Sequence, residues 1–319
     1  MPYFSVVIPL YNKENFIQAT LQSVLNQTFT DYEIIIVEDC STDKSLEVAS
    51  KISNIRIRII QHEKNKGLSA SRNTGIKNAN ANYIAFLDAD DLWKDTFLQE
   101  LFKLISEFPK AKLFATNYEE NYSNNKILLP NNNSKALKNN TSIENFFNLN
   151  LSQPLYCPSS LCVNKSIFET ITYYDETITF GEDVDFNIRA NSKFKLAYSN
   201  LPLVNYTMLS ENQITKSKIS DKTITNFDKY DDENTSKSLK KFLDFHRYIM
   251  AKLYKLEGNY EKFYKMKNGI DPSSLNKKQL LLLNLPTSIL KFVNFIKSFF
   301  LKKGIRFTSY NQLKNLHNF

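Results

Sequence analysis

Cysteine is scarce in this sequence of 319 residues, which contains only Cys40, Cys157 and Cys162 and no CxxC pair. An odd number of widely spaced cysteines argues against a disulfide framework and against a cysteine zinc site, so reduced thiols are expected. Long apolar runs are also lacking, because no uninterrupted apolar stretch reaches the ~18 residues typical of a membrane-spanning helix. The first residues show no basic segment followed by an apolar one, which indicates a cytoplasmic protein.

Glycine is equally rare, with 6 in the whole chain, and neither GxGxxG nor GxxxxGK(S/T) occurs. Such glycine-rich loops let the backbone approach phosphates, so their absence argues against a dinucleotide oxidoreductase and a P-loop NTPase. A bound nucleotide would therefore have to be held by side chains and a metal ion. The apolar fraction of 42% is ordinary for a globular protein and allows a sizeable core.

The net charge of +8 is unevenly distributed. The chain has 41 basic and 33 acidic residues. The segment 236–319 holds 17 basic and 4 acidic residues, and the rest of the chain holds 24 basic and 29 acidic residues. The tail is thus strongly basic while the bulk of the chain is mildly acidic. This asymmetry indicates an anionic partner for the tail, either nucleic acid, a membrane surface or an anionic polymer.

Strand-like and helix-like patterns alternate along the first third of the chain. Short β-rich runs predict strands at 4–9, 33–37, 55–60, 83–87 and 113–116, and apolar residues at helical spacing predict helices at 16–25, 46–52, 68–79 and 97–108. This order predicts an α/β fold with a mostly parallel, doubly wound sheet. Further along, strands are predicted at 160–163 and 203–206, helices at 165–170 and 183–190, and a surface loop over the Asn/Lys-rich residues 121–140.

An acidic turn, Asp88-Ala89-Asp90-Asp91, follows the predicted strand 83–87 directly. Open α/β sheets bind ligands at the carboxyl ends of their strands. Three carboxylates within four residues repel one another, and Mg²⁺ or Mn²⁺ with oxygen ligands would neutralise them. The alternative is a solvated turn in which Asp91 or Asp95 caps the helix that starts near Phe97.

The chain resembles the family 2 glycosyltransferases in four segments that stand in the family's order and spacing: Ser5–Asn12, Val37–Asp43, Asn65–Gly75 and Phe86–Asp91. A fifth segment, Phe180–Phe186, is similar to the family's Glu-Asp acceptor-site motif. The resemblance covers roughly residues 1–210.

The resemblance implies the GT-A fold, a Rossmann-like, mostly parallel sheet flanked by helices, in a catalytic domain of residues 1–215. Residues 1–110 would form its nucleotide-binding half and residues 111–215 its acceptor half. We expect residues 216–238 to be a linker or a mobile lid and residues 239–319 to be a basic helical extension.

The resemblance also implies an inverting, metal-dependent enzyme that moves a hexosyl or N-acetylhexosaminyl group from a UDP-sugar to a hydroxyl. The acceptor would be a glycan or a lipid-linked glycan in cell-surface polysaccharide synthesis. One rival is a sugar-nucleotidyltransferase, which should carry a Gly-rich, Arg-bearing loop where this chain has Pro9–Asn12. The other is a degenerate protein that only binds sugar nucleotides, and the retained acids argue against it.

The resemblance assigns roles in the donor site, and the chemistry of the side chains suits them. Tyr11 would stack on uracil, and Asp39 would accept the uracil N3–H. Arg72 would lie near the uridine or the phosphates, Asp88 would reach the ribose or the metal, and Asp90 would bind the metal. The expected nucleotide-sugar site comprises Pro9, Tyr11, Glu14, Asp39, Arg72, Asn73, Asp88 and Ala89, and the expected Mn²⁺ or Mg²⁺ ligands are Asp90 and Asp88.

Within the acceptor motif, Asp183 is the expected general base and Glu182 is the alternative. The competing interpretation is an acidic pair at a helix N-terminus, where the helix dipole favours negative charge. Two departures from the family concern the site. Cys40 stands where many members have glycine, so a positive φ is not expected there.

The second departure lies after residue 205, where Tyr206–Ser210 lacks the late Arg-x-His whose histidine can assist the metal. The metal would then have fewer protein ligands, unless nearby Glu211 substitutes. His62, His246 and His317 are each expected to be ordinary surface or packed histidines.

The tail contains a basic amphipathic pattern at residues 285–303, which predicts a helix lying on an anionic membrane surface. The alternative is a helix docked on the catalytic domain or between copies of the chain, giving a homo-oligomer. Nucleic acid is not expected as a partner, because no recognised nucleic-acid module accompanies the charge. The expected location is the cytoplasm, with peripheral attachment to the inner face of the cell membrane.

Overall fold

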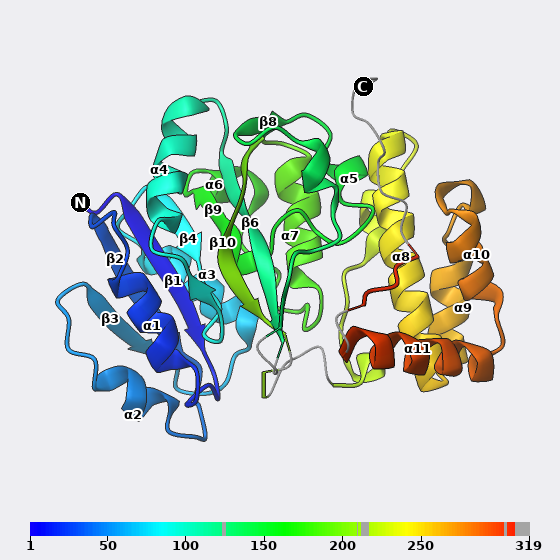
Figure 1. Ribbon diagram of the computed structural model, residues 1–319, viewed down its shortest axis with the longest axis horizontal. Coiled ribbons are helices and arrows are strands. Elements are labelled where there is room, and N and C mark those ends of the chain that lie inside the picture. Colours follow the sequence, from blue (N-terminus) through cyan, green and yellow to red (C-terminus); the bar gives the residue numbers. More distant parts are fainter. Residues whose placement is uncertain (123–125, 209, 212–216, 303–304, 310–319) are drawn as a thin grey trace.

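The computed structural model describes residues 1–122, 126–208, 210–211, 217–302 and 305–309. A sheet covered by helices forms the larger part, and a group of helices follows it (Figure 1). The strands are β1 (Phe4–Leu10), β2 (Tyr32–Glu38), β3 (Ile57–Gln61), β4 (Tyr83–Phe86), β5 (Leu92–Trp93), β6 (Leu113–Tyr122), β7 (Lys126–Leu128), β8 (Thr141–Ile143), β9 (Leu161–Asn164) and β10 (Leu196–Thr207).

The α-helices fall into two groups. Those of the sheet-bearing part are α1 (Ile17–Leu25), α2 (Ser45–Ser50), α3 (Leu68–Asn78), α4 (Phe97–Glu107), α5 (Phe146–Leu149), α6 (Ile167–Ile171) and α7 (Glu182–Asn191). The later helices are α8 (Lys237–Glu257), α9 (Tyr260–Asn268), α10 (Lys277–Asn284) and α11 (Thr287–Lys302). In the described part of the chain, no helix is both long and apolar enough to cross a membrane.

The sheet has the strand order β3-β2-β1-β4-β9-β6-β10-β5, with β7 paired to β6 and β8 paired to β10. Strands β1 to β4 pair in parallel, as do β6 and β10, whereas β9 runs antiparallel between β4 and β6. The predicted parallel sheet is therefore found in the first half, and the second half mixes directions. Because β1, β2 and β4 are parallel, their carboxyl ends meet at one edge.

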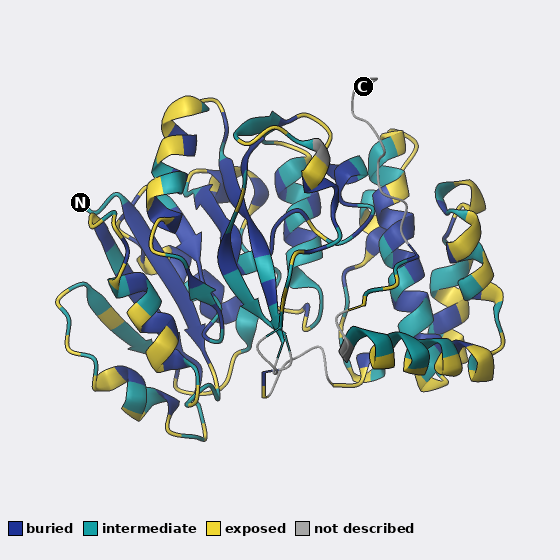
Figure 2. Ribbon diagram, in the orientation of Figure 1, coloured by how far each residue is buried: buried dark blue, intermediate teal, exposed yellow. Residues whose placement is uncertain are grey.

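Helix α3 packs tightly on the central strand β1, and one glycine permits this. A Cβ at Gly75 would lie 2.3 Å from Val7 Cγ1, which is shorter than non-bonded carbon contacts in proteins. Every residue of β1 is buried, so the strand is covered on both faces (Figure 2). Such burial is typical of a central strand in a parallel sheet that helices cover on both sides.

The prediction of a surface loop over residues 121–140 is wrong in part. Strand β6 continues to Tyr122, β7 follows it, and Asn132, Asn133 and Ser134 are buried. Asn133 Nδ2 donates to the carbonyl of Leu149 over 2.8 Å, so the amide is satisfied inside the protein. Polar composition alone therefore misidentified this segment. The strand predicted at 203–206 is likewise the end of a longer one, β10.

The helical extension expected after residue 239 is present, and its first helix belongs to the main core. Phe242, Leu243, Tyr248 and Ala251 of α8 lie in the same buried cluster as Val7 of β1. Before it, the described residues 217–236 are tied to α8, because Arg247 donates to Asp228 over 2.8 Å and to Asp231 over 2.7 Å. Helix α8 is thus fixed against the sheet-bearing part.

Candidate active site

Three motif residues that are distant in the sequence meet around the guanidinium of Arg72. Arg72 lies on α3 and is 1% exposed. Its Nη2 donates to Asp88 Oδ1 over 2.9 Å, and its Nη1 donates to Glu182 Oε1 over 2.8 Å. Asp88 follows β4 and Glu182 begins α7, so Arg72 joins the acidic turn to the acceptor motif.

The electrostatics of this cluster leave it short of positive charge. Burial alone would lower the pKa of Arg72, but the carboxylates of Asp88 and Glu182 outweigh it and raise that pKa. Burial raises the pKa of Asp88, and the charge of Asp90 adds to the rise while Arg72 opposes it. Arg72 is shared between the carboxylates of Asp88 and Glu182, so further positive charge would be stabilised here.

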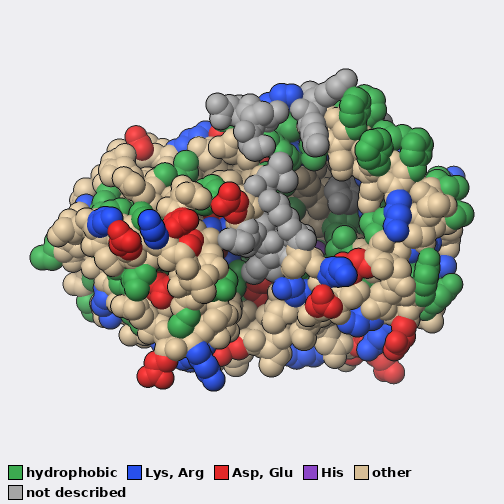
Figure 3. Space-filling view, turned by 90° about the horizontal axis from the view of Figure 1, so that it is seen from below, with side chains coloured by type: hydrophobic (Ala, Val, Ile, Leu, Met, Phe, Trp, Pro, Cys, Tyr) green, Lys and Arg blue, Asp and Glu red, His purple; other side chains and the backbone are tan. Residues whose placement is uncertain are grey.

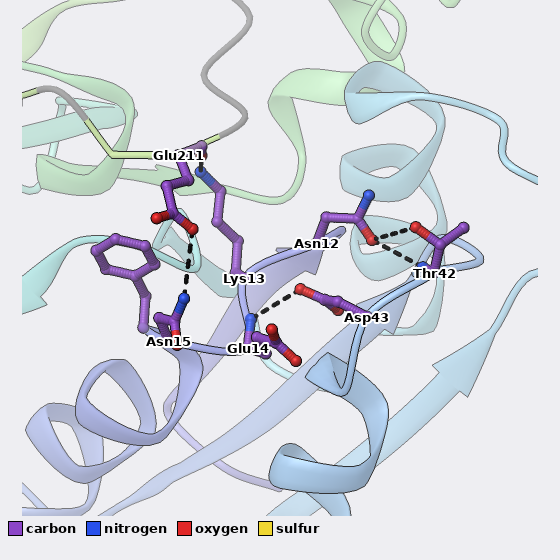
Figure 4. A pocket seen from close by; sticks show the side chains of 8 residues that line it. Asn12, Lys13, Glu14, Asn15, Thr42, Asp43 and Glu211 are labelled. Carbon is purple, nitrogen blue, oxygen red and sulfur yellow. Dashed lines mark hydrogen bonds between the residues drawn. The ribbon is translucent and has the colours of Figure 1, made fainter.

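Asp90 is held by a lysine that the sequence analysis did not single out. Lys13 Nζ lies 2.7 Å from Asp90 Oδ2. The same Nζ lies 2.8 Å from the carbonyl oxygen of Glu211 (Figure 4). Ser210 Oγ also donates to Asp90. Lys13 comes two residues after Tyr11, in the loop that leaves β1, so its place at a strand end was the available signal.

The oxygen donors of Asp88 and Asp90 suit a hard divalent cation such as Mg²⁺ or Mn²⁺. Both carboxylates already attract cationic side chains, Arg72 and Lys13, which is an independent sign that positive charge belongs beside them. Within the described ranges, no group of three or more His, Cys, Asp or Glu side chains could hold a metal on its own. Asp88 and Asp90 could thus supply two oxygen ligands to such an ion.

The alternative in which Asp91 or Asp95 caps α4 is wrong. Thr96 is the N-cap residue of α4 and its own side chain makes no capping hydrogen bond, whereas Gln27 Oε1 accepts from the first-turn Leu98 N over 2.9 Å. Asp91 is fully buried and accepts hydrogen bonds from Ser159 Oγ at 2.5 Å and Thr207 N at 2.8 Å. Its carboxylate instead ties the end of β10 to the acidic turn.

The loops after β1 and β2 form a hollow of about 290 Å³ whose lining includes Glu14, Asp43 and Glu211 (Figure 4). Glu14 Oε2 accepts from the backbone N–H of Lys44 over 2.8 Å. Tyr11 lies outside this hollow and is 43% exposed, so its ring has a free face. The carboxylate of Glu211 contacts Asn15 Nδ2 at 3.3 Å.

Asp39 is buried and its carboxylate organises the loop that follows β3. Its Oδ1 accepts from Lys66 N over 2.8 Å and lies 2.7 Å from His62 Nδ1, while its Oδ2 accepts from Gly67 N over 2.7 Å. His62 is packed, as expected, but its contact with Asp39 was not foreseen. The signal was its position directly after a strand, at the same edge as Asp39.

The other expected donor-site residues occupy structural positions around this edge. Pro9 lies within β1, and Ala89 is buried with its carbonyl accepting from Thr20 Oγ1 over 3.0 Å. Asn73 exchanges hydrogen bonds with the backbone of Tyr174, both at 2.9 Å. Asn73 thus holds the segment that leads to the acceptor motif against α3.

Asp183 and Glu182 stand in the first turn of α7, after Gly181 with a φ of +73°. Glu182 is paired with Arg72, whereas Asp183 is in no ion pair among the described residues and lines a second cavity of about 160 Å³. Burial, and then the charge of Glu182, raise the pKa of Asp183 to about 6. Both acids stand at a helix N-terminus, as the competing interpretation expects. In this position the carboxylate of Asp183 can still contact a ligand in the cavity.

The expectation that Cys40 avoids a positive φ is wrong, because its φ is +59°. Two hydrogen bonds compensate for a conformation that side chains disfavour: Cys40 N donates to Glu38 Oε2 over 3.2 Å, and Cys40 Sγ donates to the carbonyl of His62 over 3.0 Å. His246 is half-buried in the wall of the 160 Å³ cavity. His317 lies outside the described residues.

Comparison with solved structures establishes the fold. Superposition on S. aureus TarS 1-349 in complex with UDP-GlcNAc gives a TM-score of 0.64 at 17% identity and covers 98% of this chain and 94% of that one. Superposition on the structure titled S. aureus TarS gives 0.62 at 20% identity, over 92% of this chain and 54% of that one. The predicted GT-A fold with a helical extension is therefore confirmed.

Among curated proteins, the uncharacterized glycosyltransferase EpsJ of Bacillus subtilis is 32% identical over 195 residues, which is 60% of this chain and 56% of EpsJ. Glycosyltransferase GlyA of Streptococcus pneumoniae is 40% identical over 115 residues, 36% of this chain and 16% of GlyA. The Escherichia coli protein WfaP, a UDP-Glc:alpha-D-GlcNAc-diphosphoundecaprenol beta-1,3-glucosyltransferase, is 43% identical over 96 residues, 30% of this chain and 38% of WfaP. This chain thus spans between 16% and 56% of the length of these relatives.

The family model described as Glycosyl transferase family 2 matches residues 5–172, which include the first four motifs and the acidic turn. That match covers more than half of the chain. The protein therefore belongs to glycosyl transferase family 2.

Proposed function

We propose that this protein transfers a hexosyl or N-acetylhexosaminyl group from a UDP-sugar to a hydroxyl of a glycan or lipid-linked glycan acceptor, with inversion. The main support for this proposal is that Arg72 binds both Asp88 and Glu182, while Asp183 stays unpaired with Arg72 and lines a cavity. WfaP, whose name gives a UDP-glucose donor and a lipid diphosphate acceptor, supports this substrate class. So do the TarS complex with UDP-GlcNAc and TuaG, a putative teichuronic acid biosynthesis glycosyltransferase, which points to cell-surface polysaccharide.

The acidic turn and Tyr11 are the donor-binding elements of this proposal. The exposed ring of Tyr11 offers a stacking surface for uracil. Asp88 and Asp90 would hold Mn²⁺ or Mg²⁺, which when bound supplies charge stabilisation for the departing diphosphate. Lys13 and Arg72 lie beside the same two carboxylates, so they also place positive charge where UDP would leave.

Asp183 is the general base in this proposal. Its carboxylate accepts the proton of the acceptor hydroxyl while that oxygen attacks the anomeric carbon on the side opposite UDP. The bond between the anomeric carbon and the diphosphate oxygen breaks, and UDP leaves with the electron pair. Glu182 is less suited to this role, because its carboxylate is already engaged by Arg72 at 2.8 Å.

The basic tail supports a proposal of attachment to an anionic membrane surface. Leu290 is 1% exposed and faces the protein, whereas Phe292 is 62% and Phe295 is 69% exposed on the other side of α11. Hydrophobic side chains gather on this underside of the helical part (Figure 3). Helix α11 thus docks on α8 and still presents an apolar, lysine-flanked face, as interfacial helices do.

The experiment that tests the proposed function measures UDP release and product mass with Mn²⁺ and a panel of UDP-sugars. We expect release with at least one donor, dependent on an added glycan acceptor, and its loss in Asp90→Ala and Asp183→Asn. Binding of UDP-sugars without any turnover would instead identify the degenerate binding protein. Formation of a nucleotide sugar from a nucleoside triphosphate and a sugar phosphate would identify the nucleotidyltransferase.

A further inference from the structure

The 160 Å³ cavity lies where α7 and α8 face each other, and the two helices contribute different chemistry to it. Helix α7 supplies Asp183 and Asn187 as well as the apolar Val184 and Phe186, and the segment between residues 146 and 174 completes the lining. Helix α8 supplies the aromatic and aliphatic side chains of Phe242, Phe245, His246 and Ile249. The underside of the molecule is hollowed between the sheet-bearing part and the helical part (Figure 3).

The four α8 residues form one continuous face of that helix. Their positions, 242, 245, 246 and 249, follow the i, i+3, i+4, i+7 spacing of a helical stripe. Phe242 and Phe245 are each 3% exposed and anchored in the core that includes the sheet. The face is therefore held rigidly opposite α7, as a specificity wall must be.

The chemistry of the cavity suits a sugar ring. Its walls are aromatic, which matches the apolar C–H faces of a pyranose, and Asn187 and His246 offer polar groups near them. Burial lowers the pKa of His246 to about 3, so its imidazole is neutral and can hydrogen-bond to a hydroxyl. Among the residues that the structure describes, those lining the cavity include no lysine or arginine to pair with a phosphate group.

The size of the cavity is also informative. A cavity of about 150 Å³ is known to hold one benzene ring, and this one measures about 160 Å³. A single six-membered ring fits, whereas a long lipid chain would have to lie elsewhere. Asp183 at the cavity wall would then sit beside a hydroxyl of that ring.

We propose that α8 forms one wall of the acceptor subsite and that Phe245, His246 and Ile249 select the sugar ring that carries the attacking hydroxyl. This inference rests on the proposed function, because it takes Asp183 as the base. It makes the helical extension a determinant of acceptor choice.

The test uses the full chain and two variants of half-buried residues in the wall, Ile249→Trp and His246→Ala. Ile249→Trp fills the cavity, and His246→Ala removes its neutral polar group. Leu256→Trp is the matched control, because Leu256 is also half-buried, lies two helical turns further along α8, and does not line the cavity.

The probes are methyl glycosides of hexoses and N-acetylhexosamines, offered as acceptors with the donor that the wild type uses. We expect both wall variants to raise the acceptor KM by about tenfold or more. The dissociation constant of UDP and the rate of donor hydrolysis without acceptor should stay as in the wild type. Leu256→Trp should change none of these values.

An unchanged acceptor KM in both wall variants, with transfer intact in the wild type, would overturn the inference and leave the proposed function standing. Competition by octanol, with no competition by methyl glycosides, would also overturn it, since the cavity would then bind an alkyl chain. Absence of transfer by the wild type with every donor would overturn the proposed function itself.

Discussion

Removing the charge of Glu182 should shift the pH dependence of transfer without abolishing it. The pKa of Asp183 is raised from 3.8 to about 6, first by burial and second by the charge of Glu182, while Arg72 opposes the rise. Because a general base must be deprotonated, kcat/KM should rise with pH and level off above about pH 6. Glu182→Gln removes one of the two upward contributions, so the acid limb should move to lower pH by about one unit.

The measurement is kcat/KM for the acceptor between about pH 4.5 and pH 8. Glu169→Gln is the matched control, because Glu169 is an exposed glutamate on α6 whose removal changes the net charge equally. We expect the control to keep the wild-type profile. Loss of activity in Glu182→Gln at every pH, comparable to the loss in Asp183→Asn, would refute the assignment and make Glu182 the base. An unmoved acid limb would show that Asp183 does not set the profile.

Three further predictions concern the turn, the core and the tail. Lys13→Met removes the cation beside Asp90, so Mn²⁺ titrated without donor should bind more tightly, measured by electron paramagnetic resonance. Gly75→Ala forces a Cβ into β1 and should lower the free energy of unfolding by about 1–3 kcal/mol, measured by urea denaturation. Replacing Phe292 and Phe295 by serine should release the protein from anionic liposomes in a pelleting assay, while UDP binding is kept.

Each of these has a control elsewhere on the molecule. Lys44→Met removes an exposed lysine near the same loops and should leave Mn²⁺ binding unchanged. Serine at Ile55 and Ile127, which are 103% and 56% exposed and lie outside the tail, should leave liposome binding unchanged. Equal Mn²⁺ affinity in Lys13→Met and wild type would show that Lys13 does not compete with the metal. An unchanged unfolding midpoint in Gly75→Ala would show that the close packing on Val7 costs nothing to disturb. Pelleting of the double phenylalanine variant with liposomes would show that this face of α11 does not bind them.

The first half of the sheet and the acidic turn were predictable from the sequence because their signals are local. The buried strand β1 and the acidic turn Asp88–Asp91 can each be recognised from a few consecutive residues. The ends of the parallel strands were also predicted to meet at one edge of the sheet. Counting every residue that follows a strand as a candidate would have included His62 and Lys13. Composition failed where asparagines are buried, as at Asn133, because only tertiary contacts satisfy their amides.

What could not be predicted depends on contacts across large sequence separations. The pairing of Arg72 with Glu182 spans 110 residues, and it separates the roles of two adjacent acids that look equivalent in the sequence. From the sequence, Asp91 is likewise a candidate helix cap, whereas in the structure its carboxylate accepts from Thr207 N. The positive φ of Cys40 was missed because its stabilising partner, the carbonyl of His62, lies on another strand end.

In the proposed reaction the chain transfers sugar from a UDP-sugar and Asp183 takes the acceptor proton. The most direct test compares wild type and Asp183→Asn in sugar transfer to a glycan acceptor at pH 7.5, with UDP binding measured by calorimetry on the same samples. We predict that the variant binds UDP as tightly as the wild type and that its kcat falls by about 10²- to 10⁴-fold. Full transfer activity in Asp183→Asn would show that Asp183 is not the base.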